Sequence, residues 1–313
     1  MFSIGIDIGG TKILGAVVSE GGQVVRELRV ASPANDPDAM VDEVAGLIEE
    51  LSTEHEISAI GVAAAGFMDK QRETILYAPN LNWRNEPLRE RLVKRVGRDL
   101  IIENDANAAG WAEFRFGAAK NQNSMVMLTL GTGVGGAIVN DGTLMGGGFG
   151  IAGELGHITV VNDGELCGCG RRGCLEQYAS GSALLREAKK LADSADPKGE
   201  YLAQLREQAG KLKGAQVEQA ILAGDEGVLE LVQVAARRLA QGMASIVAVL
   251  DPEVFVIGGG LSELGDVIME PIRAEFENQL PAKGFRPVAQ ISAAWFSNHA
   301  GVVGAADLAA QQR

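Results

Sequence analysis

The stretch DIGGTK at residues 7–12 decides the fold, because a second stretch of the same design, TLGTGVGG at 129–136, lies further along the chain. Each joins one apolar strand to another through a turn of glycine and threonine. Glycines in such a turn leave backbone N–H groups open to an anion, and threonine adds a hydroxyl donor. The pair predicts a duplicated phosphate-binding hairpin, one copy in each of two domains. The alternative is that both are ordinary glycine-rich hairpin turns.

Strands alternate with helices along both halves of the chain, which indicates a mixed α/β sheet in each half. We place the seam between the halves near residues 116–123, and we expect a helix after Pro271. The predicted domains are a small α/β lobe of residues 1–118 plus 301–313 and a large α/β lobe of residues 119–300, which carries a zinc-binding loop.

Two segments, 131–136 and 148–153, match the G-x-G-x-x-G pattern of dinucleotide-binding proteins. That pattern requires a strand before it and a helix after it. The first segment is followed by a strand and an Asp-Gly turn, as in a hairpin, and the second lacks a strand before it. Neither indicates NAD. The sequence also lacks a GxxxxGK[ST] loop and the signatures of protein kinases.

The motif CGCGRRGC at 167–174 holds all three cysteines of the chain, Cys167, Cys169 and Cys174, and His157 lies ten residues before the first. Three thiolates and one imidazole complete a closed tetrahedral zinc site that leaves no position for water. The pattern therefore predicts a structural zinc. Free thiols, one disulfide with a cysteine left over, and another soft metal are the alternatives, although an odd count in a long chain argues against a disulfide framework.

Asp105 is the candidate for acid–base chemistry, because it lies beside Asn104 where a strand gives way to a helix. Open α/β sheets present side chains to ligands at such places, and a helix N-terminus keeps a carboxylate ionised. A simple helix-capping aspartate is the alternative. Glu154 and Glu176 flank the cysteine motif, so a zinc bound to His157 would also fix these two carboxylates in space. Carboxylates, an amide and an imidazole suit a ligand rich in hydroxyls.

The composition argues against several classes of partner. The 313 residues are 46% hydrophobic and carry a formal net charge of −13, with a sequence pI near 4.8. The acidic excess argues against nucleic acid or an anionic membrane as a partner. Apolar runs are too short for a membrane-spanning helix, and no secretory signal opens the sequence. We expect a cytoplasmic protein.

Five motifs together resemble the ROK family of sugar kinases and regulators: DIGGTK at 7–12, ENDANAA at 103–109, LGTGVGG at 130–136, GELGH at 153–157 and CGCGRRGCLEQ at 167–177. The resemblance covers nearly the whole chain. Within the family it is strongest to bacterial glucokinases, APNLNW at 78–83 included. It implies a duplicated, ribonuclease H-like fold of the actin-like ATPases, with two lobes and a sugar cleft between them. It also implies transfer of a phosphoryl group from ATP to the 6-hydroxyl of glucose, by a homodimer or homotetramer.

Carried over residue by residue, the resemblance assigns roles to the motif positions. Asp105 would be the base that deprotonates or orients the sugar 6-hydroxyl. The other sugar-binding residues would be Gly66, Asn80, Asn104, Glu154, His157 and Glu176. The phosphates of ATP, with Mg²⁺, would be held by Asp7, Gly9, Gly10, Thr11, Lys12, Gly131, Thr132 and Gly133, and Gly258 and Gly259 would lie against the nucleoside. The structural Zn²⁺ would be held by His157, Cys167, Cys169 and Cys174.

Other functions compete with glucose phosphorylation. An N-acetylhexosamine kinase or a fructokinase of the same family would carry the same motifs, and so would a non-catalytic sugar-sensing regulator. Family regulators have an added N-terminal DNA-binding segment, and we expect none here because DIGGTK begins at residue 7. The presence of Asp105 and of both glycine-threonine turns favours a kinase whose partners are a hexose and a nucleotide.

Overall fold

The computed structural model describes residues 1–78 and 81–312 and groups them into two compact units. The first unit contains Met1–Val126, Ala137–Gly153 and Trp295–Arg313, and the second contains Met127–Gly136 and Glu154–Ala294. Residues 137–153 thus belong to the first unit, whereas the boundary drawn from the sequence assigns them to the large lobe. The lobe boundaries from the sequence stay a prediction.

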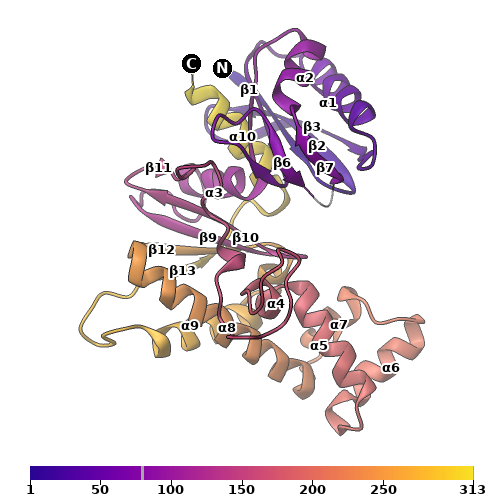
Figure 1. Ribbon diagram of the computed structural model, residues 1–313, viewed down its shortest axis with the longest axis vertical. Coiled ribbons are helices and arrows are strands. Elements are labelled where there is room, and N and C mark those ends of the chain that lie inside the picture. Colours follow the sequence, from indigo (N-terminus) through magenta and orange to yellow (C-terminus); the bar gives the residue numbers. More distant parts are fainter. Residues whose placement is uncertain (79–80, 313) are drawn as a thin grey trace. The chain divides into compact units, whose positions relative to one another are not determined.

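A five-stranded sheet lies at the centre of the first unit (Figure 1). Its strand order is β3-β2-β1-β4-β8. Its strands are β1 (Phe2–Ile8), β2 (Lys12–Ser19), β3 (Val24–Ala31), β4 (Ile57–Ala64) and β8 (Ile101–Asn104). The first three strands form an antiparallel meander, and β4 and β8 extend the sheet in parallel with β1. The turn between β1 and β2 is the DIGGTK turn, as the sequence predicts.

Helices cover both faces of this sheet: α1 (Pro37–Leu51) and α2 (Leu88–Val96) on one, and α3 (Asp105–Arg115) and α10 (Ala300–Gln311) on the other. Because side chains alternate along a strand, Ile4, Ile6 and Ile8 all face α1 and are fully buried. Leu14 and Val18 face the opposite way and pack on α3 and α10. Each face of the sheet therefore has its own apolar core.

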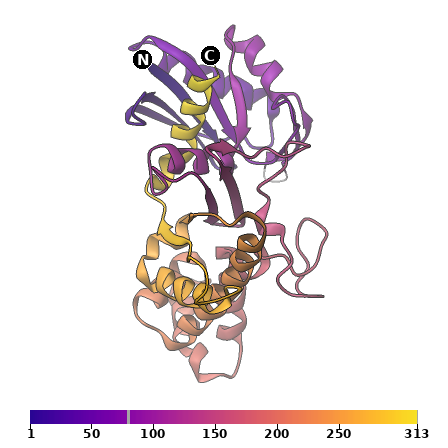
Figure 2. The same cartoon turned by 90° about the vertical axis from the view of Figure 1, so that its left-hand side faces the viewer.

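The C-terminal helix α10 packs against the sheet backbone itself. A side chain at Gly5 of β1 would place its Cβ only 1.8 Å from the carbonyl oxygen of Val302, and one at Gly61 of β4 only 2.0 Å from that of Ala305. Figure 2 shows this helix, in yellow, alongside the strands of the first unit. Glycine on the strands thus permits a contact that returns the last residues of the chain to the first unit.

A second, smaller sheet in the first unit has the order β5-β6-β7. Its strands are β5 (Phe67–Met68), β6 (Ile75–Ala78) and β7 (Trp83–Glu86). Both neighbouring pairs are antiparallel. The turn between β5 and β6 brings Asp69 and Arg72 toward the end of β8.

The other five-stranded sheet has the order β11-β10-β9-β12-β13. Its strands are β9 (Met125–Leu130), β10 (Val134–Asn140), β11 (Thr143–Leu144), β12 (Val254–Gly258) and β13 (Gln290–Ala293). The predicted second phosphate turn joins β9 to β10. Gly258 is the last residue of β12 and Gly259 follows it, so these two glycines lie at a strand end, as the glycines of the second turn do.

Helices make up most of the rest of the second unit. They are α4 (Glu176–Ala179), α5 (Gly181–Asp193), α6 (Glu200–Ala209), α7 (Gly214–Leu222), α8 (Glu226–Leu250) and α9 (Asp266–Gln279). Among the described residues, 3₁₀ helices include η2 (Leu155–His157), η3 (Pro197–Gly199), η4 (Gly260–Leu264) and η5 (Ser297–His299). Within the described ranges, no helix has the length and apolar character needed to cross a bilayer.

The helix expected after Pro271 begins earlier, at Asp266, and contains the proline. A proline inside a helix forfeits one backbone hydrogen bond and normally breaks the helix. Here Ile268, Met269 and Ile272 are buried on its inner face. This packing stabilises the helix across the proline, so the predicted start was wrong.

Candidate active site

Asn104, at the end of β8, and Asp105, at the start of α3, have different roles. Asn104 is the N-cap of α3: its Oδ1 accepts a hydrogen bond from the backbone N–H of Asn107 at 3.0 Å. Its Nδ2 donates to the carbonyl of Gly66 at 3.2 Å. The carboxylate of Asp105 accepts from adjacent backbone N–H groups, its own and that of Ala106, the latter at 2.9 Å. The simple capping role is therefore filled by Asn104, which leaves the Asp105 carboxylate free for other chemistry.

Two carboxyl groups in this part of the first unit have raised pKa values. Desolvation raises the pKa of Asp105, although the N–H of Ala106 acts in the opposite direction. Desolvation and the nearby Asp105 carboxylate raise the pKa of Asp7 to about 7, against a smaller opposing effect of Lys12. Such mutual repulsion requires that the two carboxylates lie close together. The end of β1 and the start of α3 thus form one desolvated acidic site.

The first glycine turn is closed by a hydrogen bond from the N–H of Gly9 to the carbonyl of Lys12, at 3.0 Å. Gly10, Thr11 and Lys12 are exposed at its tip. A tip with an exposed glycine backbone, a hydroxyl and an ammonium group is suited to bind an anion.

The second glycine turn, in the second unit, is held from both sides. The N–H of Gly131 donates to the carbonyl of Gly133 at 3.0 Å, and the N–H of Gly181 donates to the carbonyl of Gly131 at 2.8 Å. The carboxylate of Glu176 accepts from the N–H of Val134 at 3.2 Å, and a Cβ at Gly133 would lie 2.3 Å from its Oε2. Thr132, between the two glycines, is exposed. Glycine is needed at 133 because the carboxylate of Glu176 lies against the backbone there.

The glycines after β12 lie against the strand that leads to the second turn. Gly259 has a left-handed backbone, with φ of 81°, and a Cβ there would lie 2.6 Å from the carbonyl carbon of Leu130. An apolar pocket in the second unit is lined by Leu130, Leu261 and residues of α5, α8 and α9. The cavity has a volume of about 20 Å³, which is room for about one water molecule.

The four predicted zinc ligands come together in the second unit. Cys167 Sγ lies 3.6 Å from His157 Nδ1, Cys169 Sγ lies 3.6 Å from Cys174 Sγ, and all four ligand atoms are within 4.8 Å of one another. Zinc–sulfur bonds of about 2.3 Å in a tetrahedron place two sulfurs about 3.8 Å apart, whereas a disulfide needs about 2.05 Å. The spacing fits one tetrahedral metal ion and does not fit a disulfide.

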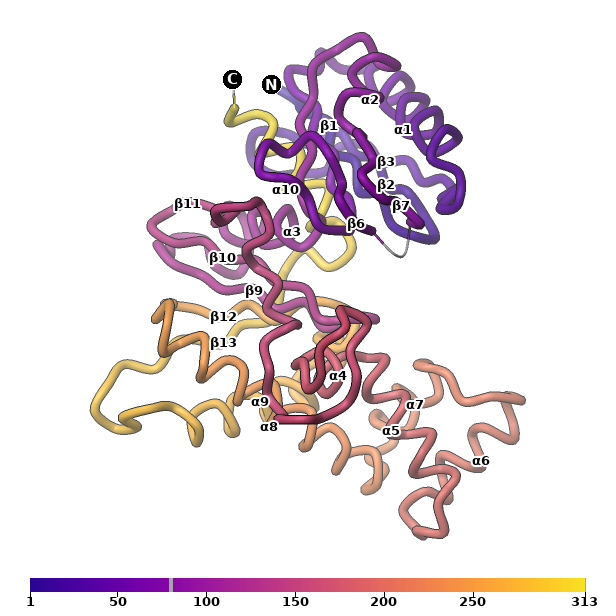
Figure 3. The backbone as a smooth tube through the Cα atoms, viewed as in Figure 1, coloured from indigo at the N-terminus to yellow at the C-terminus, as the bar shows by residue number. Residues whose placement is uncertain are grey.

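The loop that carries these ligands is irregular backbone between η2 and α4, which Figure 3 traces as a tube. Two isolated β-bridges, Thr159 with Cys174 and Leu166 with Arg172, fold it back on itself. Gly173 is required there, since its φ is 78° and a Cβ would lie 1.7 Å from the carbonyl oxygen of Val161.

The three thiols of the four-ligand cluster ionise together only if a cation is bound. Burial, reinforced by the neighbouring thiols, raises the pKa of Cys174 to about 12. Without a cation the three sulfurs therefore do not ionise together at neutral pH, whereas a bound metal ion deprotonates the thiols that coordinate it. Nε2 of His157 lies 4.0 Å from the carboxylate of Glu154, while Nδ1 faces Cys167. This arrangement, in which a carboxylate faces the outer nitrogen of a ligating histidine, is common at zinc sites.

Contacts thus link most of the predicted site residues within each unit. Asp7 lies near Asp105 and Asn104 contacts Gly66 in the first unit, and Glu154 and Glu176 lie beside predicted zinc ligands in the second. Asn80 lies outside the described residues. Sequence reasoning did not single out Arg72 and Glu103, which form an ion pair next to Asn104. Glu103 is part of the ENDANAA motif, but no local pattern marks Arg72.

Comparisons with known proteins show which family and which solved structures the chain is similar to. The model of the ROK family matches residues 3–312. A glucokinase of Streptomyces coelicolor is 44% identical over 308 residues, which cover 98% of this chain and 97% of that protein. The crystal structure of a ROK family glucokinase from Streptomyces griseus, in complex with glucose and AMPPNP, is 42% identical, with a TM-score of 0.88 over 99% of this chain and all of that one. That of a ROK hexokinase from Thermus thermophilus is 32% identical, with a TM-score of 0.80 over 100% of this chain and 99% of that one.

The chain belongs to the ROK family. Its two units have the actin-like ATPase fold of the ROK kinases, with the mixed α/β sheets that the sequence predicts. The expected family and fold class are therefore confirmed.

Proposed function

We propose that this protein is a glucokinase, which transfers the γ-phosphoryl group of ATP to the 6-hydroxyl of glucose. The sequence similarity to glucokinases along almost the whole chain supports a sugar kinase of this kind. The single structural observation that carries the proposal is the Asp105 carboxylate, which is partly buried and is not used to cap its helix.

Asp105 acts in this proposal as the base that orients the 6-hydroxyl and accepts its proton. Desolvation raises its pKa toward the working pH, which improves a carboxylate as a general base. Phosphoryl transfer depends mainly on positioning and on charge stabilisation, so a fixed base and two phosphate-binding turns are sufficient protein equipment. The remaining hydroxyls of the sugar are held by Gly66, Asn80, Asn104, Glu154, His157 and Glu176.

The two glycine turns hold ATP in this proposal. Asp7, Gly9, Gly10, Thr11 and Lys12 of one turn, and Gly131, Thr132 and Gly133 of the other, surround the phosphates. Gly258 and Gly259 lie against the nucleoside. A Mg²⁺ ion on the phosphates would neutralise their charge.

A structural zinc on His157, Cys167, Cys169 and Cys174 fixes the residues that flank it. Glu176 contacts both Cys167, at 3.6 Å, and the N–H of Val134 beside the second turn. Glu154 lies beside His157. The zinc would therefore hold two sugar-binding carboxylates still before the sugar arrives.

We further propose that the enzyme works in the cytoplasm, where ATP is available and thiols stay reduced. The expectation of a homodimer or homotetramer stays a prediction, which light scattering of the purified protein tests.

A coupled assay of ADP release tests the proposed function. The purified protein is given ATP and Mg²⁺ with glucose, N-acetylglucosamine, N-acetylmannosamine or fructose. In a parallel series polyphosphate replaces ATP, and formation of the sugar phosphate is measured because no ADP is released. We expect the highest kcat/KM with glucose and ATP. A higher value with an N-acetylhexosamine or fructose would reassign the substrate, and no ADP release with any sugar would indicate a sugar sensor instead.

A further inference from the structure

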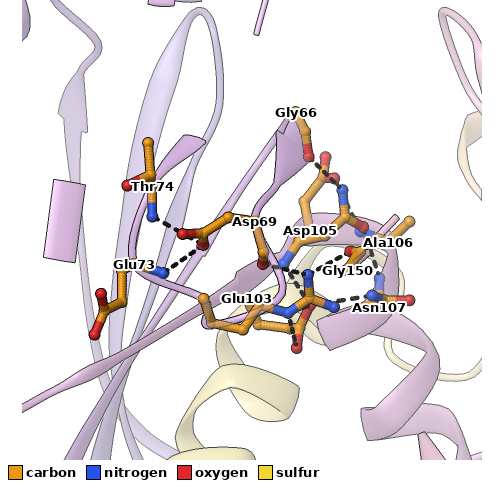
Figure 4. Close-up of polar contacts among 11 residues, drawn as sticks. Gly66, Asp69, Glu73, Thr74, Glu103, Asp105, Ala106, Asn107 and Gly150 are labelled. Atoms are coloured by element: carbon orange, nitrogen blue, oxygen red, sulfur yellow. Dashed lines mark hydrogen bonds and ion pairs between the residues drawn. The ribbon is translucent and has the colours of Figure 1, made fainter. Parts of the chain in front are cut away.

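The turn between β5 and β6 holds Arg72 in an unusual backbone conformation. Its φ is 58°, in the left-handed region that residues other than glycine and asparagine seldom adopt. The carboxylate of Asp69 fixes the turn by accepting the N–H groups of Glu73 at 2.8 Å and Thr74 at 3.1 Å, as Figure 4 shows. An arginine kept at a position that favours glycine suggests that its side chain has a use there.

The guanidinium of Arg72 forms a buried ion pair with Glu103. Nε lies 3.0 Å from both carboxylate oxygens, and the side chains are only 17% and 11% exposed. The same carboxylate accepts the backbone N–H of Asn104 at 2.8 Å and the side-chain amide of Asn107 at 3.0 Å. Arg72 therefore orients the carboxylate that fixes the residue next to Asp105.

Arg72 also binds a glycine-rich segment, residues 146–150, from a distant part of the chain. Its Nη1 donates to the carbonyl of Gly150 at 2.5 Å, and a Cβ at Gly146 would lie 3.3 Å from Nη2. A Cβ at Gly150 would lie 2.6 Å from the backbone of Asp69, so the segment and the turn touch at the backbone. This segment runs on through Gly153 directly into Glu154.

We propose that Arg72 is a positioning residue, which fixes both the Asn104–Asp105 strand end and the glycine-rich segment before Glu154 in the arrangement that binds sugar. The inference rests on the proposed function. Its three parts are the ion pair with Glu103, the hydrogen bond to Gly150 and the strained turn that aims the guanidinium at both. Arg72 acts through these neighbours and does not touch the reacting atoms.

Arg72→Asn tests the proposal, because asparagine tolerates the left-handed backbone and is too short to reach Glu103 and Gly150 as the guanidinium does. Misplacement of binding groups by a fraction of an ångström to about 1 Å costs on the order of ten- to hundred-fold in catalysis. We expect the KM for glucose to rise at least about ten-fold while the KM for ATP changes less than about two-fold. Arg72→Lys, which keeps the charge, should recover part of the loss. Arg95→Ala is the matched control: Arg95, on α2, binds the carboxylates of Asp42 and Glu49 on α1, and its loss should leave both KM values unchanged.

Hydrogen exchange gives a second reading that does not depend on catalysis. The N–H of Ala152 bonds to the carbonyl of Gly146 and reports on the glycine-rich segment. In Arg72→Asn this amide should exchange faster, and in Arg95→Ala it should not. Unchanged exchange together with an unchanged KM for glucose would overturn the proposal, as would a fall in kcat alone. If the wild type phosphorylates no sugar, the proposed function fails. Faster exchange in Arg72→Asn would then still support the Arg72 contacts, and unchanged exchange would refute them.

Discussion

Replacing Asp7 by asparagine should make the folded protein less sensitive to rising pH. The pKa of Asp7 is about 7 in the folded chain and about 3.8 in the unfolded chain. The folded state therefore binds the proton more tightly, so this group adds stability at low pH that is lost as the pH rises from about 4 to about 7. A shift of about 3 pKa units corresponds to roughly 4 kcal/mol. Of this, about 3 kcal/mol is lost between pH 5 and pH 8.

The assay is urea unfolding at pH 5 and pH 8, without Mg²⁺ or nucleotide. Asparagine has nearly the same shape as aspartate but carries no charge. The free energy of unfolding of Asp7→Asn, relative to that of the wild type, should therefore be clearly higher at pH 8 than at pH 5. Asp42→Asn is the control, because Asp42 is exposed on α1. Equal differences between Asp7→Asn and the wild type at both pH values would refute the explanation by desolvation and by repulsion from Asp105.

Two further variants test the second unit. Cys169→Ser should lose bound zinc, measured by mass spectrometry. It should lose glucose affinity together with the zinc, measured by calorimetry. Unchanged glucose affinity in a zinc-free sample would contradict the positioning role of the metal. Gly133→Ala should raise the KM for ATP on the order of ten-fold, because its Cβ would displace the Glu176 carboxylate, 2.3 Å away, from the turn. Gly46→Ala, where a Cβ meets open space, is the control, and an equal KM in both variants would refute this account.

Local patterns were sufficient for the parts of the site that neighbouring residues build. The DIGGTK turn forms between β1 and β2 as predicted, because an apolar strand, two glycines and a second strand specify a hairpin within a few residues. The four predicted metal ligands converge because glycines allow the backbone between them to fold tightly. The role of zinc itself stays a prediction.

Contacts between distant residues could not be predicted in this way. Arg72 is 31 residues from Glu103 and 78 from Gly150 in the sequence, and the residues around Arg72 do not indicate either partner. The predicted start of α9 was wrong for a related reason. The packing of buried side chains on this helix outweighs the local effect of Pro271. The sequence also could not show which of Asn104 and Asp105 caps α3, because either residue type can cap a helix.

The most direct test of the catalytic assignment is the turnover of Asp105→Asn with glucose and ATP, measured beside its glucose affinity. Asparagine keeps the size of the side chain but cannot accept the hydroxyl proton. The account predicts that kcat falls on the order of 10²- to 10⁴-fold, while the dissociation constant for glucose stays within a few-fold of the wild type. A kcat close to that of the wild type would contradict it.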